Sequence, residues 1–359
     1  MDARRERAGG IRIGGRAVGP GHPCFVIAEA GVNHNGDVER ALALVDAAAD
    51  ARADAVKFQT FRAEAVVSRF APKAAYQRSA TDPGESQLDM VRALELGADA
   101  HRRIAARCEA RGVAFLSSPF DDASADLLVE LGAPALKTGS GELTNLPFLA
   151  HLARKGLPLL VSTGMADLAE VERAVRTISE NGSPPLALLH CVSAYPASPR
   201  DANIRAMRTL SERFRVPVGF SDHALGDAIA LAACALGADL VEKHFTLDKR
   251  LPGPDQAMSL SPDELAAFVA RVRDVEAALG DGVKRPMPGE RDVRAVARRS
   301  LVALGPLAAG TALDAGMLAA KRPGTGVPPD RLADVVGRRL ALPLAADEPL
   351  TWAHLGGDR

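Results

Sequence analysis

The sequence lacks the features that mark secreted, membrane-spanning and zinc-knuckle proteins. Its first ten residues, MDARRERAGG, are charged and contain no apolar signal-peptide core, and no run of about 18 uncharged apolar residues follows. The cysteines form no C-x-x-C pair, a pattern typical of reduced buried thiols rather than of a disulfide framework. They are Cys24, Cys108, Cys191 and Cys234. We therefore expect a cytoplasmic protein with its cysteines in the core.

An excess of charge of one sign is also missing. Lysine and arginine total 44 against 45 for aspartate and glutamate, a formal net charge of −1. This balance gives no electrostatic reason to expect a nucleic acid or an acidic membrane as partner. Any anion must then be bound by a local cluster of residues. With 359 residues, 47% apolar and 25% charged, the chain suits a folded protein with a large barrel, with or without a small second domain.

A unit of strand, turn and helix repeats along most of the chain. Short apolar runs with strand character alternate with amphipathic segments rich in alanine and leucine, such as Val38–Arg52, Leu168–Glu180 and Pro262–Leu279. We predict eight strands, at Phe25–Glu29, Ala55–Gln59, Val113–Ser118, Ala135–Thr138, Leu159–Thr163, Leu186–Cys191, Val218–Ser221 and Leu240–Phe245.

These strands are apolar at nearly every position, which indicates a parallel sheet buried on both faces by helices. Eight such units over about 250 residues match the size of a closed (β/α)8 barrel, the TIM barrel. A doubly wound open sheet is the alternative, but no G-x-G-x-x-G follows the first strand. We therefore predict an α/β fold built on a TIM barrel.

Polar residues that can take part in chemistry stand at the end of every predicted strand. In a parallel barrel all of these carboxyl ends meet at one rim, so one mouth would collect them. A separate role as a helix cap could explain any one of these residues. It does not explain well why all eight strands end in such residues. The residues are Glu29, Lys57, Gln59, Ser117, Ser118, Lys137, Ser162, Thr163, Cys191, Ser193, Ser221, His223, Glu242 and His244.

The repeat ends near Gly280. A stretch with prolines, glycines and many charges follows, and then short apolar pieces broken by Gly-Pro, Pro-Gly and Pro-Pro. We predict a catalytic barrel over residues 1–283, a linker over 284–299 and a small β-rich domain over 300–359. A domain of about 60 residues is marginal alone, so we expect it to dock on a barrel, its own or a partner's.

The loop after the fourth predicted strand, Lys137-Thr138-Gly139-Ser140-Gly141-Glu142, has the composition of a phosphate-binding turn. Its glycines let backbone N–H groups converge, Ser140 adds a hydroxyl, and the next helix adds the positive end of its dipole. Ser162, Thr163 and Gly164 form a second cluster of hydroxyls and glycine at the next strand end.

Lys57 ends an apolar strand, where an unpaired ammonium group would be costly, so it needs a facing anion. One interpretation is a buried ion pair with Glu29 or Glu142. The other is that Lys57 and Lys137 bind the two ends of one small polyanion. Phosphoenolpyruvate, which carries a carboxylate and a phosphate, has that shape.

His223 and His244 end the last two strands, which are neighbours in a barrel, so both imidazoles can reach one point. Glu29 or Glu242 can add an oxygen ligand and leave room for water and substrate. A mixed nitrogen and oxygen site suits a divalent Lewis acid. We expect a divalent metal cofactor, with Mn²⁺ as first choice and Mg²⁺, Co²⁺ or Zn²⁺ as alternatives.

A series of motifs spread over nearly the whole chain resembles the sialic acid synthases. In order they are AEAGVNHNGD at 28–37, VKFQT at 56–60, FLSSPFDD at 115–122, LKTGSGELTN at 136–145, STGM at 162–165, LHCVSAYP at 189–196, GFSDHA at 219–224, EKHFTLD at 242–248 and KRPGTG at 321–326. The resemblance implies condensation of phosphoenolpyruvate with an N-acetylmannosamine-like aldose to a nine-carbon 2-keto sugar acid. It also implies a barrel followed by an antifreeze-like (SAF) domain, and a domain-swapped homodimer in which that domain caps the partner's barrel.

The resemblance further implies a role for each matching residue. C3 of phosphoenolpyruvate would attack a metal-polarised aldehyde, water would add at C2, and C–O cleavage would release phosphate. The catalytic residues would be Glu29, Glu142 and Lys57. Phosphoenolpyruvate would be bound by Lys57 and Ser118 at its carboxylate and by Lys137, Ser140 and Ser162 at its phosphate, and Ser193 and Ser221 would complete this pocket. The sugar would be bound by Gln59, Tyr195, Asp255 and Arg322, and the metal ion by His223 and His244.

Two positions depart from the family pattern, and several alternatives stay open. Gln256 stands where many members carry His, and Ser193 stands where some carry Asn. The acceptor is N-acetylmannosamine, its 6-phosphate or a 2,4-diacetamido-6-deoxy sugar that leads to legionaminic acid. The competing functions are another synthase of 3-deoxy sugar acids that uses phosphoenolpyruvate, a metal-dependent aldolase, and a non-catalytic carbohydrate-binding barrel.

Overall fold

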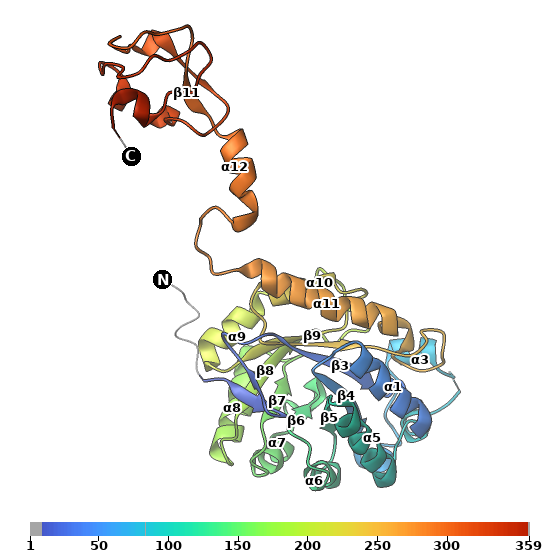
Figure 1. Ribbon diagram of the computed structural model, residues 1–359. Coiled ribbons are helices and arrows are strands. Elements are labelled where there is room, and N and C mark those ends of the chain that lie inside the picture. Colours follow the sequence, from blue (N-terminus) through green and yellow to red (C-terminus); the bar gives the residue numbers. More distant parts are fainter. Residues whose placement is uncertain (1–8, 83, 358–359) are drawn as a thin grey trace. The chain divides into compact units, whose positions relative to one another are not determined.

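The computed structural model describes residues 9–82 and 84–357, and the chain divides after Gly280 into two units. The first unit contains eight parallel strands in the hydrogen-bonded order β5-β4-β3-β10-β9-β8-β7-β6. The two strands at the ends of this order, β5 and β6, pack against each other, so the sheet closes into a barrel ringed by helices (Figure 1). The prediction of a TIM barrel is confirmed.

Each predicted strand is present, and its ends lie within two residues of the prediction. The barrel strands are β3 (Phe25–Gly31), β4 (Ala55–Thr60), β5 (Ala114–Pro119), β6 (Leu136–Thr138), β7 (Leu159–Ser162), β8 (Leu186–Cys191), β9 (Val218–Asp222) and β10 (Leu240–His244).

The helices follow the strands and cover the outside of the barrel. They are α1 (Val38–Asp50), α5 (Ala98–Arg111), α6 (Asp122–Glu130), α7 (Leu146–Ala153), α8 (Leu168–Glu180), α9 (Ala206–Phe214), α10 (Ala228–Ala235) and α11 (Pro262–Leu279). Several begin where a side chain accepts a bond from a free N–H group of the first turn: Asp37 at α1, Asp121 at α6, Asp167 at α8 and Ser261 at α11.

Three short helices interrupt the connection from β4 to α5. They are α2 (Ala63–Val66), α3 (Ala75–Ala80) and α4 (Gln87–Ala93). Lys73, whose side chain is buried, holds this connection together, because its ammonium group donates to Thr81 Oγ1 at 3.0 Å, the Asp82 carbonyl at 2.7 Å and Glu85 Oε2 at 2.9 Å.

A hairpin that the sequence analysis did not predict precedes the barrel. β1 (Ile11–Ile13) and β2 (Arg16–Val18) pair antiparallel across Gly14 and Gly15, whose φ angles of 53° and 83° favour glycine. Its side chains Ile11, Ile13 and Val18 join the apolar cluster that fills the barrel interior. The hairpin therefore closes the amino end of the barrel.

The barrel interior changes from apolar to polar along its axis. Phe25 and Ile27 of β3 belong to the interior cluster, and so does Ala55 of β4. Because side chains of a strand alternate between its faces, the next inward residues are Glu29 and Lys57. Together with the hairpin, the apolar layer forces any polar site to the carboxyl end.

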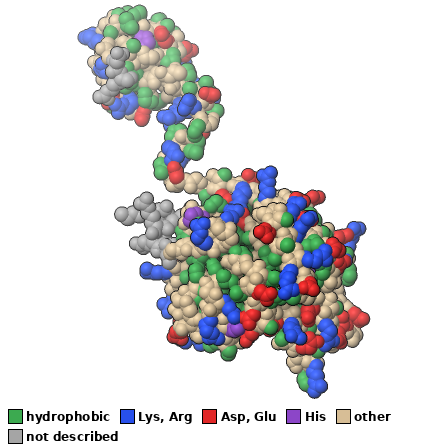
Figure 2. All heavy atoms as spheres, turned by 60° about the horizontal axis from the view of Figure 1, so that its bottom comes forward, with side chains coloured by type: hydrophobic (Ala, Val, Ile, Leu, Met, Phe, Trp, Pro, Cys, Tyr) green, Lys and Arg blue, Asp and Glu red, His purple; other side chains and the backbone are tan. Residues whose placement is uncertain are grey.

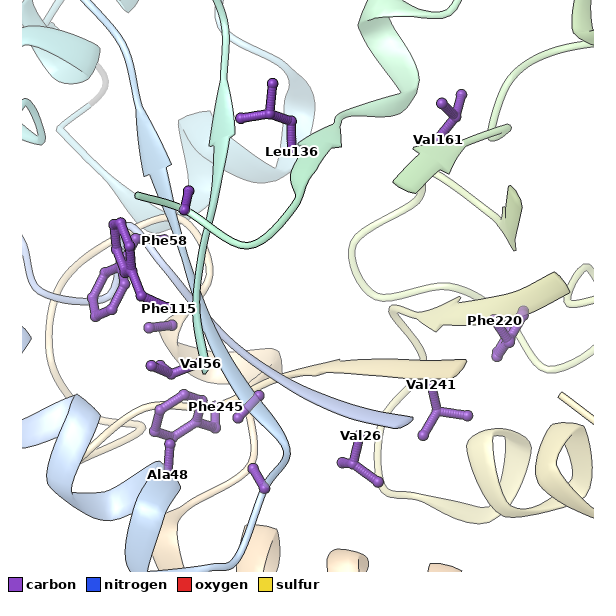
Figure 3. Packing of buried hydrophobic residues seen from close by; sticks show 14 of the residues in the cluster. Val26, Ala48, Val56, Phe58, Phe115, Leu136, Val161, Phe220, Val241 and Phe245 are labelled. Carbon is purple, nitrogen blue, oxygen red and sulfur yellow. The ribbon is translucent and has the colours of Figure 1, made fainter. Parts of the chain in front are cut away.

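The outward side chains of the strands form a second apolar layer beneath the helices. It includes Val26, Val56, Phe220 and Val241 of the strands and Ala48 of α1, all of them buried. Figure 3 shows part of this layer. This layer on the outside and the interior cluster explain why the strands are apolar at nearly every position.

The second unit is a small antiparallel β region, as predicted. After η4 (Pro288–Glu290) and α12 (Arg291–Ala297), β11 (Ser300–Ala303) pairs with β12 (Leu318–Lys321). The remaining short helices are η5 (Ala315–Met317), η6 (Pro329–Arg331), α13 (Leu332–Val335) and η7 (Trp352–Leu355). Its core consists mainly of leucine and valine, including Leu301, Leu313, Val327, Leu340 and Leu350.

Charges of both signs are mixed over the barrel surface. On the face that Figure 2 shows, Lys and Arg side chains are interspersed with Asp and Glu side chains. Across residues 9–82 and 84–357, no helix combines the length and the apolar character needed to cross a membrane.

One buried carboxylate joins the hairpin, β3 and α11 at the amino end of the barrel. Asp54 Oδ2 accepts from the Val26 N–H at 2.8 Å and from Arg273 Nη2 at 2.9 Å, and Asp54 Oδ1 pairs with Arg16. The Asp54 side chain is 3% exposed. Its three donors belong to segments that are far apart in the sequence.

We predict that Asp54→Ala lowers the free energy of unfolding of the barrel by about 2 kcal/mol, because a buried N–H and two guanidinium groups lose their acceptor. Urea denaturation followed by circular dichroism measures this. Asp50→Ala, which removes an exposed partner of Arg111 at the end of α1, serves as control and should cost at most about 0.5 kcal/mol. Equal losses in both variants would contradict the role given to Asp54.

Candidate active site

A cavity of about 410 Å³ lies at the carboxyl ends of the barrel strands, and every strand contributes to its lining. Lys57, Lys137, His223 and His244 all face it. The other predicted site residues that line it are Glu29, Gln59, Ser118, Ser140, Ser162, Ser193, Tyr195, Ser221 and Asp255. The structure therefore brings the predicted polar strand ends together at one mouth of the barrel.

Two predicted residues stand apart from this group. Glu142 is not among the residues that line the cavity in the described chain, and its carboxylate accepts from Asn145 Nδ2 at 2.8 Å. Arg322 belongs to the second unit, immediately after β12. Gln256, one of the two departures, is buried behind the cavity, where Nε2 donates to the Asn33 carbonyl at 3.0 Å.

Two lysines and two glutamates form a buried network on the cavity floor. Lys57 Nζ lies 2.7 Å from Glu29 Oε2, 3.8 Å from Glu242 Oε2, and donates to Ser118 Oγ at 3.0 Å. The buried ion pair considered for Lys57 thus forms with Glu29 rather than with Glu142.

Lys137 approaches the same network from the other side. Its ammonium group donates to Ser162 Oγ at 2.6 Å and to the Thr138 carbonyl at 3.0 Å, and it lies 3.9 Å from Glu242 Oε1. Glu242 also accepts from Ser221 Oγ at 2.8 Å. The carboxylate of Glu242 therefore lies between the two ammonium groups.

The two carboxylates differ in their pKa values. Burial raises the pKa of Glu29 to about 7, although Lys57 opposes the shift. Burial acts in the same direction on Glu242, but Lys137 and Lys57 outweigh it and bring that pKa to about 2. Glu29 is thus the carboxyl that can exchange a proton near neutral pH, while Glu242 stays ionised.

The pKa values of the two lysines are shifted in opposite directions. Burial lowers the pKa of Lys57, but Glu242 and Glu29 outweigh burial, so its pKa is raised overall. The pKa of Lys137 is lowered, mainly because burial disfavours its charged form. An anionic phosphate beside Lys137 would favour its charged form and so raise its pKa again.

Beside Lys137, the loops after β6 and β7 form a narrow polar cradle. The Gly164 N–H donates to Ser140 Oγ at 3.1 Å, and Ser140 Oγ lies 3.0 Å from Cys191 Sγ. A Cβ atom on Gly164 would lie 2.7 Å from Ser140 Oγ and 2.8 Å from Cys191 Sγ, and closer still to Ser193 Oγ. Because Gly164 has no side chain, these three side chains can pack this closely against its backbone. Cys191 is buried as expected, but it lines the cavity.

His223 and His244 lie together on the opposite part of the floor, with ring centroids 5.4 Å apart. Burial lowers the pKa of both imidazoles, and for His244 the neighbouring His223 adds to the shift. His223 Nδ1 bonds to the Val192 carbonyl at 2.9 Å, which leaves Nε2 with a lone pair. His244 Nδ1 is buried without a hydrogen-bond partner.

Two neutral imidazoles with free nitrogens fit a divalent metal ion. The expected oxygen ligand from Glu29 or Glu242 does not complete the set: in the described parts of the chain no three His, Cys, Asp or Glu side chains are grouped closely enough to hold a metal. Burial raises the pKa of Asp255, which lies 3.9 Å from His244 Nδ1, to about 6. Substrate or water oxygens would have to fill the remaining positions.

Two parts of the site were not predicted from the sequence. Glu242, the first residue of EKHFTLD, was expected at the rim and as an oxygen ligand, but not as the partner of both lysines. The connection from β4 to α5 received no role, yet it supplies an apolar wall of the cavity. That wall consists of Phe61, Val66, Val67, Met90, Val91 and Leu94. The unusual length of this connection was the available signal.

Comparisons with known proteins show the family of this chain. Residues 44–284 match the model of the NeuB family, and residues 298–356 match the SAF domain. The N,N'-diacetyllegionaminic acid synthase of Legionella pneumophila is 45% identical over 92% of this chain and 94% of its own length. The human N-acetylneuraminate-9-phosphate synthase is 37% identical over 94% of each chain.

A solved structure gives the same result. The N-acetylneuraminic acid synthetase of Leptospira borgpetersenii, solved in complex with citrate, has a TM-score of 0.70 and 35% identity, covering 80% of this chain and 95% of that one. The family match over most of the barrel and the identity to curated relatives across nearly the whole length show that this chain belongs to the NeuB family of sialic acid-type synthases.

Proposed function

We propose that this protein condenses phosphoenolpyruvate with an unphosphorylated N-acetylmannosamine-like aldose, giving a nine-carbon 2-keto sugar acid and phosphate. One observation carries the proposal: a single cavity contains two separate lysine and serine pairs, Lys57 with Ser118 and Lys137 with Ser162. One pair suits a carboxylate and the other, beside the Ser140 and Gly164 cradle, suits a phosphate.

Glu29 is the acid-base group of this proposal. Its pKa of about 7 suits proton transfer at neutral pH, and its carboxylate reaches the cavity beside Lys57. Glu142, the other candidate, bonds to Asn145 and does not belong to the described cavity lining. Glu29 would accept a proton from the water that adds at C2, where positive charge develops once C3 has attacked the aldehyde.

Glu242 has a different role in the proposal. It stays ionised between Lys57 and Lys137 and offsets the repulsion between the two ammonium groups before substrate binds. When the substrate's carboxylate and phosphate arrive, each lysine gains a further anionic partner. They bind and orient phosphoenolpyruvate with its reacting carbon toward the histidines.

His223 and His244 would hold the divalent metal ion, for which Mn²⁺ is our first choice. When bound, such an ion supplies Lewis-acid polarisation of the acceptor's carbonyl group. Tyr195 packs against His223, with ring centroids 4.3 Å apart, and walls off this corner of the cavity. With Gln59 and Asp255 it would bind the sugar.

The acceptor's far end would meet the apolar wall from the β4 to α5 connection. Within the described residues, Lys57 and Lys137 are the only cations that line the cavity. Lys73 bonds inside the connection itself, Arg78 bonds to the Lys73 carbonyl, and Arg69 stacks on Phe70. This lining favours a 6-deoxy acceptor such as a 2,4-diacetamido sugar over a 6-phosphate, in line with the greater identity to the Legionella legionaminic acid synthase.

We also keep two proposals from the family resemblance. The first is that the protein forms a domain-swapped dimer, with residues 1–283, 284–299 and 300–359 as barrel, linker and SAF domain. The second is that Arg322 of one copy contributes to acceptor recognition at the barrel of the other.

The proposed reaction is tested with purified protein, Mn²⁺, phosphoenolpyruvate and each of the three acceptors. We expect phosphate release and a product that reacts with periodate and thiobarbiturate, fastest with the 2,4-diacetamido-6-deoxy sugar, and loss of both signals in EDTA. Absence of turnover with every mannosamine derivative would refute the proposal. Fastest turnover with the 6-phosphate would refute the acceptor assignment alone.

Gly164→Ala should raise the KM for phosphoenolpyruvate roughly tenfold or more, equivalent to a loss of about 1.4 kcal/mol of binding, because the new methyl group would collide with Ser140, Cys191 and Ser193 and displace them from the cradle. Steady-state kinetics with each substrate varied in turn measures the change. Gly97→Ala is the control, since a Cβ there meets no atom within 4 Å. An unchanged KM in a folded Gly164→Ala protein would place the phosphate elsewhere.

Arg322→Ala should raise the acceptor KM much more than that for phosphoenolpyruvate, because the proposal gives this side chain only to the acceptor. Arg331→Ala, which removes an exposed arginine paired with Asp334 in the same unit, is the matched control. Equal effects of Arg322→Ala on both substrates would contradict the assignment.

A further inference from the structure

A second buried ion pair lies on the outer face of the barrel, one residue before each of the two histidines. Asp222 ends β9 and Lys243 lies in β10, and the two residues are direct partners in the parallel register. Lys243 Nζ lies 2.9 Å from Asp222 Oδ2, and both side chains are 1% exposed. Neither belongs to the cavity lining, because side chains alternate along a strand.

We propose that Asp222 and Lys243 are positioning residues that fix the spacing of His223 and His244 for a divalent metal ion. The inference rests on the proposed function only in taking these histidines as the metal ligands. It assigns the pair a task in metal binding and none in binding phosphoenolpyruvate.

The hydrogen bonds of the pair converge on the residue that follows His223. Asp222 Oδ1 accepts from the Ala224 N–H at 2.8 Å, and Lys243 Nζ donates to the Ala224 carbonyl. Both backbone groups of Ala224 are thus tied to the pair. His223 lies between two residues that cannot move independently of β10.

His223 itself is held from the side of β8. Its Nδ1 bonds to the Val192 carbonyl at 2.9 Å, and its own carbonyl accepts from the Ala197 N–H at 2.9 Å. These bonds orient the ring but do not connect it to His244. Beyond the backbone ladder of β9 and β10, the Asp222 and Lys243 pair links the side chains of these two strands directly before the histidines.

Replacing a buried ion pair by apolar residues often leaves stability unchanged, whereas leaving one member unpaired is destabilising. Apolar packing could therefore supply the stability that the pair contributes. It could not supply the directional hydrogen bonds that the pair makes to Ala224. Groups that orient metal ligands typically change metal affinity 10- to 100-fold when removed. The pair precedes both histidines by one residue on the outer face of the same strands, and this position lets it orient them as metal ligands.

The test is the dissociation constant for Mn²⁺ alone, measured on the full-length protein by calorimetry or by the electron paramagnetic resonance of free Mn²⁺. We expect Lys243→Met to raise this constant about 10- to 100-fold. The dissociation constant for phosphoenolpyruvate, measured on EDTA-treated protein, should change less than about threefold. This split separates positioning from general destabilisation.

Lys73→Met is the matched control, because it removes another buried lysine with three oxygen partners in the same unit. It should lower the melting temperature without changing Mn²⁺ affinity. If Lys243→Met does not fold, Asp222→Asn replaces it, since the amide oxygen can still accept from Ala224. We expect that variant to weaken Mn²⁺ binding at least severalfold.

His223→Ala distinguishes failure of the inference from failure of the proposed metal site. If His223→Ala leaves Mn²⁺ binding intact, the metal site is wrong and the inference falls with it. If His223→Ala abolishes binding while folded Lys243→Met and Asp222→Asn bind Mn²⁺ like the unchanged protein, the inference alone is wrong.

Discussion

The burial of four charges in the barrel mouth is the constraint on which the site depends. Lys57, Lys137, Glu29 and Glu242 are each nearly inaccessible, and none could remain charged at that depth without the others. The network keeps two ammonium groups ready for an anion, and it separates the two carboxylates into one that can exchange protons and one that cannot. Binding and proton transfer thus follow from one arrangement of charges.

The apolar half of the barrel makes that arrangement tolerable. The hairpin residues Ile11, Ile13 and Val18 close the amino end, and the interior cluster fills the barrel below Glu29 and Lys57 with apolar side chains. On the outside, the ion pair of Asp222 and Lys243 stands one residue from each histidine. Charged groups therefore lie on both faces of the same strand ends, facing the cavity on one side and fixing the backbone on the other.

Strand positions and polar strand ends were predictable because both are local properties. Each predicted strand reappears, and thirteen of the predicted site residues line one cavity. The hairpin was missed although Gly14-Gly15 is a turn signal, because three-residue strands carry little periodicity. Glu142 was assigned to the site through the family resemblance, yet the short 3-10 helix at Ser140–Glu142 turns its carboxylate to Asn145.

The sequence by itself determined the barrel, the break near Gly280 and the kinds of side chain at the rim, since periodicity and composition are written in neighbouring residues. Only the tertiary structure decided that Glu242 lies between two lysines, that Ser140 and Cys191 pack against Gly164, and that Asp222 faces Lys243. Those relations depend on strand register and on contacts between residues far apart in the chain. No local pattern encodes them, because the same residues in another register would face different partners.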